Sequence, residues 1–329
     1  ATRVKYSDMT IRKKTGAANR KVQKFMNLMN METVHVAWDF LKENGLKALI
    51  LKSKHKIQGI DDDYDYAEWW NLTKPSEEEL EEQKKKTFGY MPKFSIVIPV
   101  YKTPEKFLKE MLDSIVEQTY ANWELCIADG SPAGESVENV LKKYAEKDAR
   151  IRYQVLGENR GISGNTNAAL EMAEGDFIVL ADHDDRLTPN ALFECAKKLN
   201  ENENCDVLYS DEDKLDMDGD ELFDPHFKPD FNPDLLTSVN YICHLFVVKK
   251  ELLDKVGGFR PEYDGAQDYD FIFRCTENAK QICHIPKVLY HWRCHPNSTA
   301  SNPESKLYAF TAGSRAIMEH YKRVGIEAE

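Results

Sequence analysis

The sequence predicts an α/β fold: a Rossmann-like, mixed but mainly parallel sheet with helices on both faces, preceded by a helical N-terminal extension. From residue 93 onward, short β-rich runs alternate with helical runs, as in strand-helix-strand units. The chain of 329 residues is 42% hydrophobic and 11% aromatic, enough to close a sizeable core. We therefore expect a globular protein and exclude a disordered one.

Charge is unevenly distributed along the chain. The formal net charge is −12, yet residues 1–60 hold 13 Lys and Arg against 4 Asp and Glu, a net +9 that leaves −21 for the remainder. The acidic balance argues against nucleic acid as a partner. The basic segment predicts either an anionic partner or a solvated pair of helices, and its charge alone leaves both open.

Cysteine usage and hydropathy indicate the compartment. The seven cysteines are an odd number, scattered mostly through apolar runs, which is typical of thiols and not of a disulfide framework. No apolar stretch approaches the roughly 18 to 20 residues that span a bilayer, and the N-terminus has no signal-peptide core. We expect a reducing, cytoplasmic location.

The chain is predicted to have three parts. Residues 1–90 form the basic helical extension and an acidic connector, in which Ser76 and Glu79 make a capping box. Residues 91–302 form the α/β domain, divided into halves 91–212 and 213–302, and residues 303–329 form a C-terminal helix. Strands are expected at 94–99, 123–128, 151–156, 177–181 and 207–210, and helices at 104–118, 136–147, 163–173 and 189–200.

Turn residues support these boundaries. Thr103 and Thr188 each precede a proline at a strand-to-helix turn, so each is predicted to cap the helix that follows. Gly175 is expected just past a helix end, leading into the strand at 177–181.

Polar residues follow the predicted strands at their carboxyl ends, the edge at which such sheets bind ligands. They are residues 99–101, 129–131, 157–161 and the run Asp182, His183, Asp184 and Asp185. Three carboxylates within four residues repel one another unless a cation or hydrogen bonds hold them. Mg²⁺ or Mn²⁺ is the economical explanation, although Asp185 alone has a helix cap as its alternative role.

With these residues the chain resembles the family 2 glycosyltransferases of the GT-A fold. The matching motifs run in order from about residue 93 to about residue 301: residues 96–101 (Ile-Val-Ile-Pro-Val-Tyr), 114–120, 123–125, 129–131, 159–163, 182–185, 257–259 and 267–270. The resemblance implies an inverting, metal-dependent transferase that uses nucleotide-sugar donors. Residues 285–298 resemble more narrowly the bacterial enzymes of O-antigen, capsule and rhamnose-containing polysaccharide assembly.

The resemblance also implies where the donor and the metal bind. The residues implied to contact the nucleotide sugar are Pro99, Val100, Tyr101, Asp129, Asn159, Gly161 and Asp182. Asp129 would accept the N3 hydrogen of uracil or thymine, so the donor is expected to be a UDP- or dTDP-sugar, and Asp182 would lie near the ribose. Asp184 would bind Mn²⁺ or Mg²⁺ between the two phosphates. His291 is either a further metal ligand or a structural histidine beside Trp292.

Asp268 stands where the family carries its catalytic base. A carboxylate within hydrogen-bond reach takes the proton of the acceptor hydroxyl as the new bond forms. Gln267 replaces the Glu of many relatives, and Asp270 is expected to pair with Arg274 one turn along. The residues expected on the acceptor side are Asp211, Asn240, Tyr241, Gln267, Trp292 and Arg293. The acidic run at 209–214 is also compatible with a solvated loop.

The expected function is sugar transfer to a saccharide acceptor, lipid-linked at the inner face of the plasma membrane, in bacterial surface polysaccharide synthesis. Residues 1–60 would attach peripherally to that membrane or pack against a second transferase domain or subunit. The alternative is a catalytically inactive binding or scaffold domain. A zinc module at residues 275–295 has poor ligand spacing, and a Rossmann dehydrogenase would need a Gly-x-Gly-x-x-Gly that does not follow the first strand.

Overall fold

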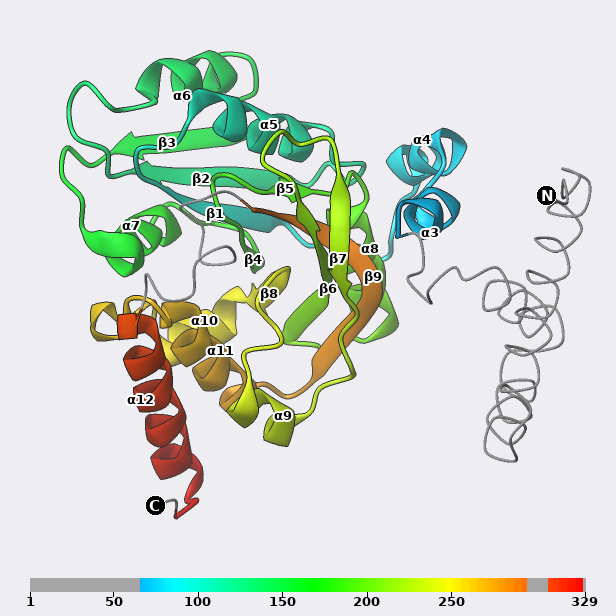
Figure 1. The fold of residues 1–329 in the computed structure, drawn as a ribbon. Helices are drawn as coiled ribbons and strands as arrows, with labels where there is room; N and C mark the ends of the chain where they lie inside the picture. The colour runs from blue at the N-terminus through cyan, green and yellow to red at the C-terminus, as the bar shows by residue number, and fades with distance from the viewer. Residues whose placement is uncertain (1–65, 295–306, 328–329) are drawn as a thin grey trace, which may run out of the picture. The chain divides into compact units, whose positions relative to one another are not determined.

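The computed structural model describes residues 66–294 and 307–327 (Figure 1). The chain divides into two compact units, Ala1–Trp69 and Trp70–Glu329. The predicted helical extension at 1–60 and the first residues of the acidic connector, 61–65, lie outside the described residues, as do residues 295–298 of the C-terminal motif. All of the strands described below belong to the second unit.

Nine strands form one mixed sheet among the described residues. They are β1 (Phe94–Val100), β2 (Trp123–Asp129), β3 (Ile151–Val155), β4 (Phe177–Leu180), β5 (Arg186–Leu187), β6 (Val207–Leu215), β7 (Leu222–His226), β8 (Phe246–Lys249) and β9 (Ile282–Arg293). Their order is β3-β2-β1-β4-β8-β6-β9-β5, with β7 paired to β6. Strands β3, β2, β1 and β4 are parallel, whereas β8 runs antiparallel to both β4 and β6. The predicted α/β class is confirmed.

Helices cover both faces of this sheet (Figure 1). The described helices are α3 (Tyr66–Thr73), α4 (Glu77–Lys85), α5 (Glu105–Val116), α6 (Glu138–Ala145), α7 (Gly161–Leu170), α8 (Ala191–Glu201), α9 (Pro233–Ser238), α10 (Lys250–Val256), α11 (Gln267–Asn278) and α12 (Leu307–Val324), with a 3₁₀ turn η1 (Pro261–Tyr263). Helices α5, α6 and α8 pack on one face, and α7, α10, α11 and α12 contribute to the core on the other.

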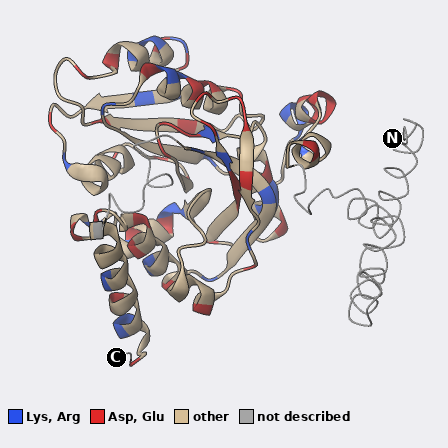
Figure 2. Cartoon of the chain, in the orientation of Figure 1, with Lys and Arg blue, Asp and Glu red and all other residues tan. Residues whose placement is uncertain are grey.

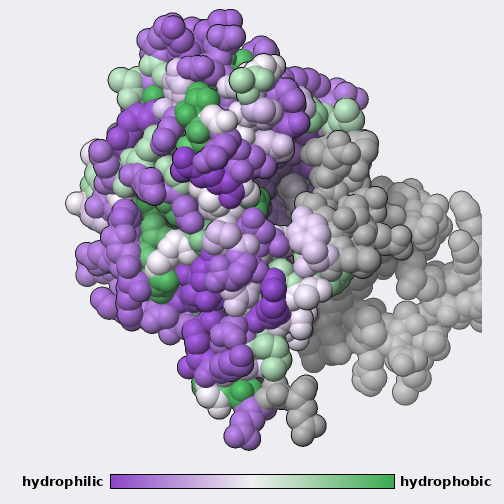
Figure 3. Space-filling model, turned by 90° about the vertical axis from the view of Figure 1, so that its left-hand side faces the viewer, coloured by the Kyte–Doolittle hydropathy of each residue, from purple (hydrophilic) through white to green (hydrophobic). Residues whose placement is uncertain are grey.

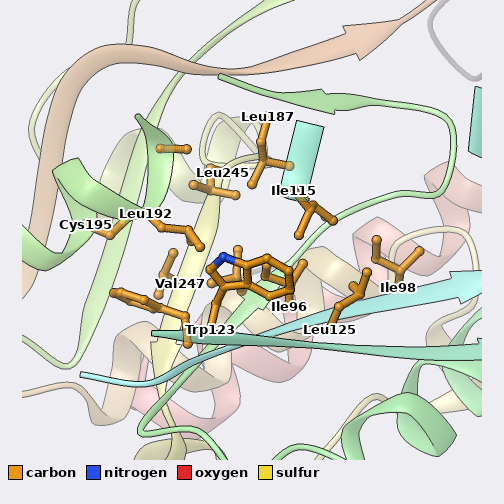
Figure 4. Close-up of a cluster of buried hydrophobic side chains, with 14 of the residues drawn as sticks. Ile96, Ile98, Ile115, Trp123, Leu125, Leu187, Leu192, Cys195, Leu245 and Val247 are labelled. Atoms are coloured by element: carbon orange, nitrogen blue, oxygen red, sulfur yellow. The ribbon is translucent and has the colours of Figure 1, made fainter. Parts of the chain in front are cut away.

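The alternation of β1 explains how one strand serves two cores. Ile96 and Ile98 belong to the cluster under α5 and α8, whereas Val97 between them belongs to the cluster under α7 and α11. Figure 4 shows Trp123 of β2 in the first cluster, beside Ile96 and Leu125. A strand buried on both faces reads as a continuous apolar run, as residues 96–100 do.

The helix boundaries confirm one capping prediction and correct three others. Ser76 and Glu79 form the expected capping box at α4, which has acidic residues in its first turn and basic ones in its last (Figure 2). Thr103 and Thr188 cap no helix: each Oγ1 is buried without a hydrogen-bond partner among the described residues. Helix α7 ends at Leu170, and Gly175 serves close packing instead, because an added Cβ would lie 2.6 Å from the Lys93 carbonyl oxygen.

The surface near the carboxyl ends of β2 and β3 is mainly hydrophilic, with smaller hydrophobic areas between the polar side chains (Figure 3). Within the part of the chain that is described, no helix has both the length and the apolar character that crossing a membrane requires.

Candidate active site

A cavity of about 490 Å³ opens where the expected edge of the sheet meets α7 and α11. It is lined by Val97, Pro99, Ile162, Thr166, Leu180, Ala181, Asp182, Cys243, His244, Phe259, Asp264, Gly265, Gln267, Asp268, Trp292 and Tyr308. Five of the predicted site residues are in this lining: Pro99, Asp182, Gln267, Asp268 and Trp292. Its size and its mixture of apolar walls and a few polar groups are typical of a ligand site.

Asp182 and His244 of this lining form a group with the buried Asp185, in which each residue offers one ligand atom within 4.8 Å of the others. Asp182 follows β4, while His244 precedes β8, which is antiparallel to β4 and therefore begins at the same edge. His244 Nε2 lies 3.5 Å from Asp182 Oδ2, and the imidazole stacks on the Tyr290 ring at 4.6 Å between centroids. No local motif marks His244 in the sequence, because its partners are far away along the chain.

Electrostatics in this group favour a cation. Burial alone lowers the pKa of His244, but the hydrogen bond to Asp182 and the charges of Asp182, Asp185 and Glu212 outweigh it and raise that pKa to about 9. Burial, with the charges of Asp184 and Asp182, raises the pKa of Asp185 well above its ordinary value. A positive charge on the imidazole therefore offsets part of the carboxylate repulsion.

The same group has donors suited to a divalent metal. His244 Nδ1 is buried and has no hydrogen-bond partner in the described part of the chain. Asp185 is the deepest member, 1% exposed, and its oxygens already accept from the Tyr290 hydroxyl at 2.6 Å and the Arg293 amide at 2.7 Å. Two carboxylates with an imidazole suit Mn²⁺ better than Mg²⁺, which favours oxygen ligands. The residues present fit such an ion.

Asp268 lies in the first turn of α11. Its Oδ2 accepts a hydrogen bond of 2.9 Å from Asn240 Nδ2, so one carboxylate oxygen has a defined orientation. Burial raises the pKa of Asp268, while the positive charge of His244 opposes that rise. A carboxylate with a raised pKa in a cavity is a candidate general base.

Asp264 is a pocket residue that sequence reasoning missed. Its Oδ1 accepts from the Ser163 hydroxyl at 2.5 Å and lies 3.3 Å from the Ser163 amide, in the first turn of α7. Gly161, which begins this helix, has φ of +74°, and an added Cβ would lie 2.6 Å from Asp264 Oδ2. Glycine is required here by both the backbone conformation and the approach of the carboxylate.

The other residues predicted for the donor side are not in the pocket lining. Val100 is buried in β1, and Tyr101 is 40% exposed. Asp129 is fully buried and accepts from Ser131 N at 2.9 Å, Ser136 Oγ at 2.6 Å and Val137 N at 3.2 Å. Asn159 Oδ1 accepts from the Gly161 amide and from Asn165 Nδ2, both at 3.0 Å. Asp129 and Asn159 thus hold the loops that follow β2 and β3.

The structure does not bring Asp184 and His291 into the group formed by Asp182, Asp185 and His244. His291 is buried in β9, and its Nδ1 lies 2.5 Å from Asp213 Oδ1. Asp184 Oδ1 lies 3.5 Å from His183 Nδ1. The ligand roles of Asp184 and His291 stay predictions.

Three residues expected on the acceptor side are buried away from the cavity. Arg293 is fully buried, donating to the Asp184 carbonyl at 2.6 Å and to Glu110 at 2.5 Å, so it anchors the acidic turn. Asp211 is 2.8 Å from His284 Nε2, and Tyr241 packs edge-on against Tyr209 at 6.0 Å. Asn240 acts on the pocket through its hydrogen bond to Asp268.

Comparisons with known proteins indicate the family of this chain. Residues 95–257 match the model of "Glycosyl transferase family 2". The O-antigen biosynthesis protein RfbC of Myxococcus xanthus is 36% identical over 265 residues, 80% of this chain, but the chain spans only 21% of its length. The uncharacterized glycosyltransferase MJ1057 of Methanocaldococcus jannaschii is 30% identical over 231 residues, 67% of this chain and 77% of that protein.

A solved structure shares the fold. S. aureus TarS 1-349 in complex with UDP-GlcNAc aligns with a TM-score of 0.56 and 24% identity over 72% of this chain and 68% of that one. Together with the family model and the relatives, this supports the resemblance read from the motifs at residues 96–101, 182–185 and 267–270. The chain belongs to glycosyl transferase family 2.

Proposed function

We propose that this chain transfers a sugar from a UDP- or dTDP-sugar to a saccharide acceptor, with inversion at the anomeric carbon, in bacterial surface polysaccharide synthesis. The observation that carries the proposal is the position of Asp268: it lines the same cavity as Asp182 and His244, and Asn240 orients its carboxylate. A base and a group that attracts the charged donor thus share one site.

Asp268 removes the proton of the acceptor hydroxyl. The acceptor oxygen forms its bond to the anomeric carbon while the bond from that carbon to the donor phosphate oxygen breaks, and the proton goes to the carboxylate of Asp268. One displacement inverts the configuration, and no covalent intermediate is needed. The raised pKa of Asp268 helps this step, because a stronger base holds the proton better.

Asp182, Asp185 and His244 would hold a divalent cation at the donor phosphates. When bound, Mn²⁺ or Mg²⁺ neutralises the charge that develops on the departing nucleoside diphosphate. In its absence the His244 imidazolium supplies a positive charge at the same place. Asp184 with His291 is the ligand pair predicted from sequence, and variants of Asp184 and His244 would distinguish the two sites.

Donor binding is assigned to the side of the cavity formed by Pro99 and Asp182, and acceptor binding to the side formed by Gln267 and Trp292. Asp129 contributes by holding the loop after β2, and direct recognition of uracil or thymine by its carboxylate stays a prediction. The lipid-linked acceptor and peripheral membrane attachment through residues 1–60 are likewise predictions.

The proposal is tested with a thermal-shift panel of UDP-GlcNAc, other UDP-sugars, dTDP-sugars and GDP-mannose, each with Mn²⁺, Mg²⁺ or EDTA. Selective stabilisation by UDP- or dTDP-sugars that needs the metal is expected. Release of nucleoside diphosphate from the stabilising donor then separates the enzyme from an inactive binding domain. Equal stabilisation by all nucleotides, or by none, would contradict the proposed donor class.

A further inference from the structure

A buried ion pair lies directly behind His244. Its members are Glu212 of β6 and Lys228, which follows β7. The proposed reaction uses neither residue. The side chains of Lys228 and Glu212 are 0% and 6% exposed, and Lys228 Nζ lies 3.3 Å from Glu212 Oε2. Two charges this deeply buried require specific partners.

These partners are the backbone groups of the pocket segment. Lys228 Nζ donates to the carbonyl of Ile242 at 2.7 Å and to the carbonyl of His244. Glu212 Oε2 accepts from the amide of His244 at 3.2 Å. Both backbone polar groups of His244 are therefore held by the two members of one ion pair.

The ion pair itself is fixed from behind. The Lys228 amide donates to Asp211 Oδ1 at 2.9 Å, and Asp211 Oδ1 also lies 2.8 Å from His284 Nε2 on β9. A pair of apolar side chains of similar volume would fill the same space without the cost of burying charge. It would leave the carbonyls of residues 242 and 244 and the amide of 244 without these partners, and the segment would lose its defined path.

We propose that Glu212 and Lys228 are positioning residues that hold His244 at the distance from Asp182 at which the group binds a metal-nucleotide complex. This inference rests on the proposed function for its ligand. It assigns a role to Glu212, which belongs to the run at 209–214 that the sequence analysis left compatible with a solvated loop, and to Lys228. In the structure the pair contacts the pocket segment through the backbone of residues 242–244.

The test compares Lys228→Met, Glu212→Gln and the double variant with Lys93→Met. Lys93 pairs with buried Glu124 at 2.6 Å at the amino ends of the strands, away from the cavity, so it controls for loss of an ion pair as such. Glu212→Gln keeps an oxygen that can accept from the His244 amide, and the double variant leaves no unpaired buried charge should Lys228→Met fold poorly.

Two measurements are made on each folded variant: the Kd of UDP with Mn²⁺ by calorimetry, and hydrogen exchange of the peptide covering residues 240–246. Lys228→Met and the double variant are expected to weaken UDP binding about 10- to 100-fold and to speed exchange of that peptide. For Glu212→Gln, both the Kd of UDP and the exchange rate should lie between those of the Lys228→Met variants and those of the wild type. Lys93→Met should change neither quantity by more than about twofold.

Unchanged UDP affinity in the folded double variant would overturn the proposal. If wild-type protein binds no UDP with Mn²⁺, the proposed donor class fails, and hydrogen exchange alone then decides the positioning role. Unchanged exchange at residues 240–246 in both Lys228→Met and the double variant would overturn it in that case as well.

Discussion

Polar residues in two regions of the sheet edge differ in how far along the chain their hydrogen-bond partners lie. After β2 and β3, Asp129 bonds to groups 2, 7 and 8 residues away, and Asn159 bonds to groups 2 and 6 residues away. Around the cavity, Asp268 bonds to Asn240, 28 residues away, and Asp185 to Tyr290, 105 residues away. The first region stabilises its own loops, whereas the second is assembled by tertiary structure.

Because of this difference, we expect the loop region to contribute mainly to the stability of the fold and the cavity region mainly to binding and catalysis. Changes in the loop region should lower the free energy of unfolding with little effect on the reacting groups, because those loops do not line the cavity. Changes around the cavity should alter binding or turnover more than stability. Each of the following experiments tests whether the two regions divide in this way.

The largest effect is expected for Asp268→Asn. The amide keeps the shape of the side chain but cannot accept the proton of the acceptor, so kcat should fall about 10²- to 10⁴-fold. The Kd of the donor and the midpoint of thermal unfolding should stay close to those of the wild type. Steady-state transfer kinetics with the donor found in the thermal-shift panel measure the first quantity, and calorimetry measures the others.

Asp254→Asn is the matched control for this change, since Asp254 is 61% exposed and pairs with Lys250 on the surface of α10. It should leave kcat unaltered. Transfer by Asp268→Asn within a few-fold of the wild type would remove Asp268 from the proposed mechanism and move the search for a base to Asp264.

The pH dependence of metal-free protein tests the charge of His244. The folded pKa of about 9 lies above the ordinary value of 6.5, so this group stabilises the fold fully below pH 6.5. That contribution is lost as the pH rises through about 9, and the free energy of unfolding should fall by about 3 kcal/mol across the window. Urea unfolding in EDTA at several pH values measures it.

His244→Gln should flatten this part of the pH profile, because the variant has no imidazole to titrate. The loop-region variant Asp129→Ala should keep the wild-type slope. A wild-type profile that is level between pH 6.5 and 9 would mean that His244 is neutral in the metal-free protein.

Asp129→Ala should mainly destabilise the fold. Removing the carboxylate leaves the amides of Ser131 and Val137 and the hydroxyl of Ser136 without their acceptor, at a cost of about 2 to 4 kcal/mol. Urea unfolding measures the loss, and donor kinetics are measured below the onset of unfolding. A selective loss of UDP- or dTDP-sugar binding, with stability intact, would instead support nucleobase recognition by Asp129.

The same contrast explains what the sequence predicts well. The strands at 94–100, 123–129 and 151–155 were predicted within one residue at each end. The first two are buried along their whole length and therefore have mainly apolar sequences. Motif position placed Asp268 and Asp182 at the cavity. His244 could not be found this way, since an isolated histidine before a strand has no local signal, and its meaning depends on β4 and β8 being neighbours. The expectation that Arg293 lies on the acceptor side failed for a similar reason: Arg293 is buried, and its partner Glu110 is 183 residues away in the chain.

The smallest effects are expected when an asparagine is replaced by alanine in each region, in the separate variants Asn159→Ala and Asn240→Ala. Each removes a side-chain amide that makes one or two hydrogen bonds, and each should lower the free energy of unfolding by about 1 kcal/mol. Only Asn240→Ala frees the Asp268 carboxylate to rotate, so it alone should lower kcat, by about tenfold, with KM for the donor unchanged. Equal kinetic losses in the two variants would show that the loop after β3 also orders the reacting groups, and the division between the regions would then be wrong.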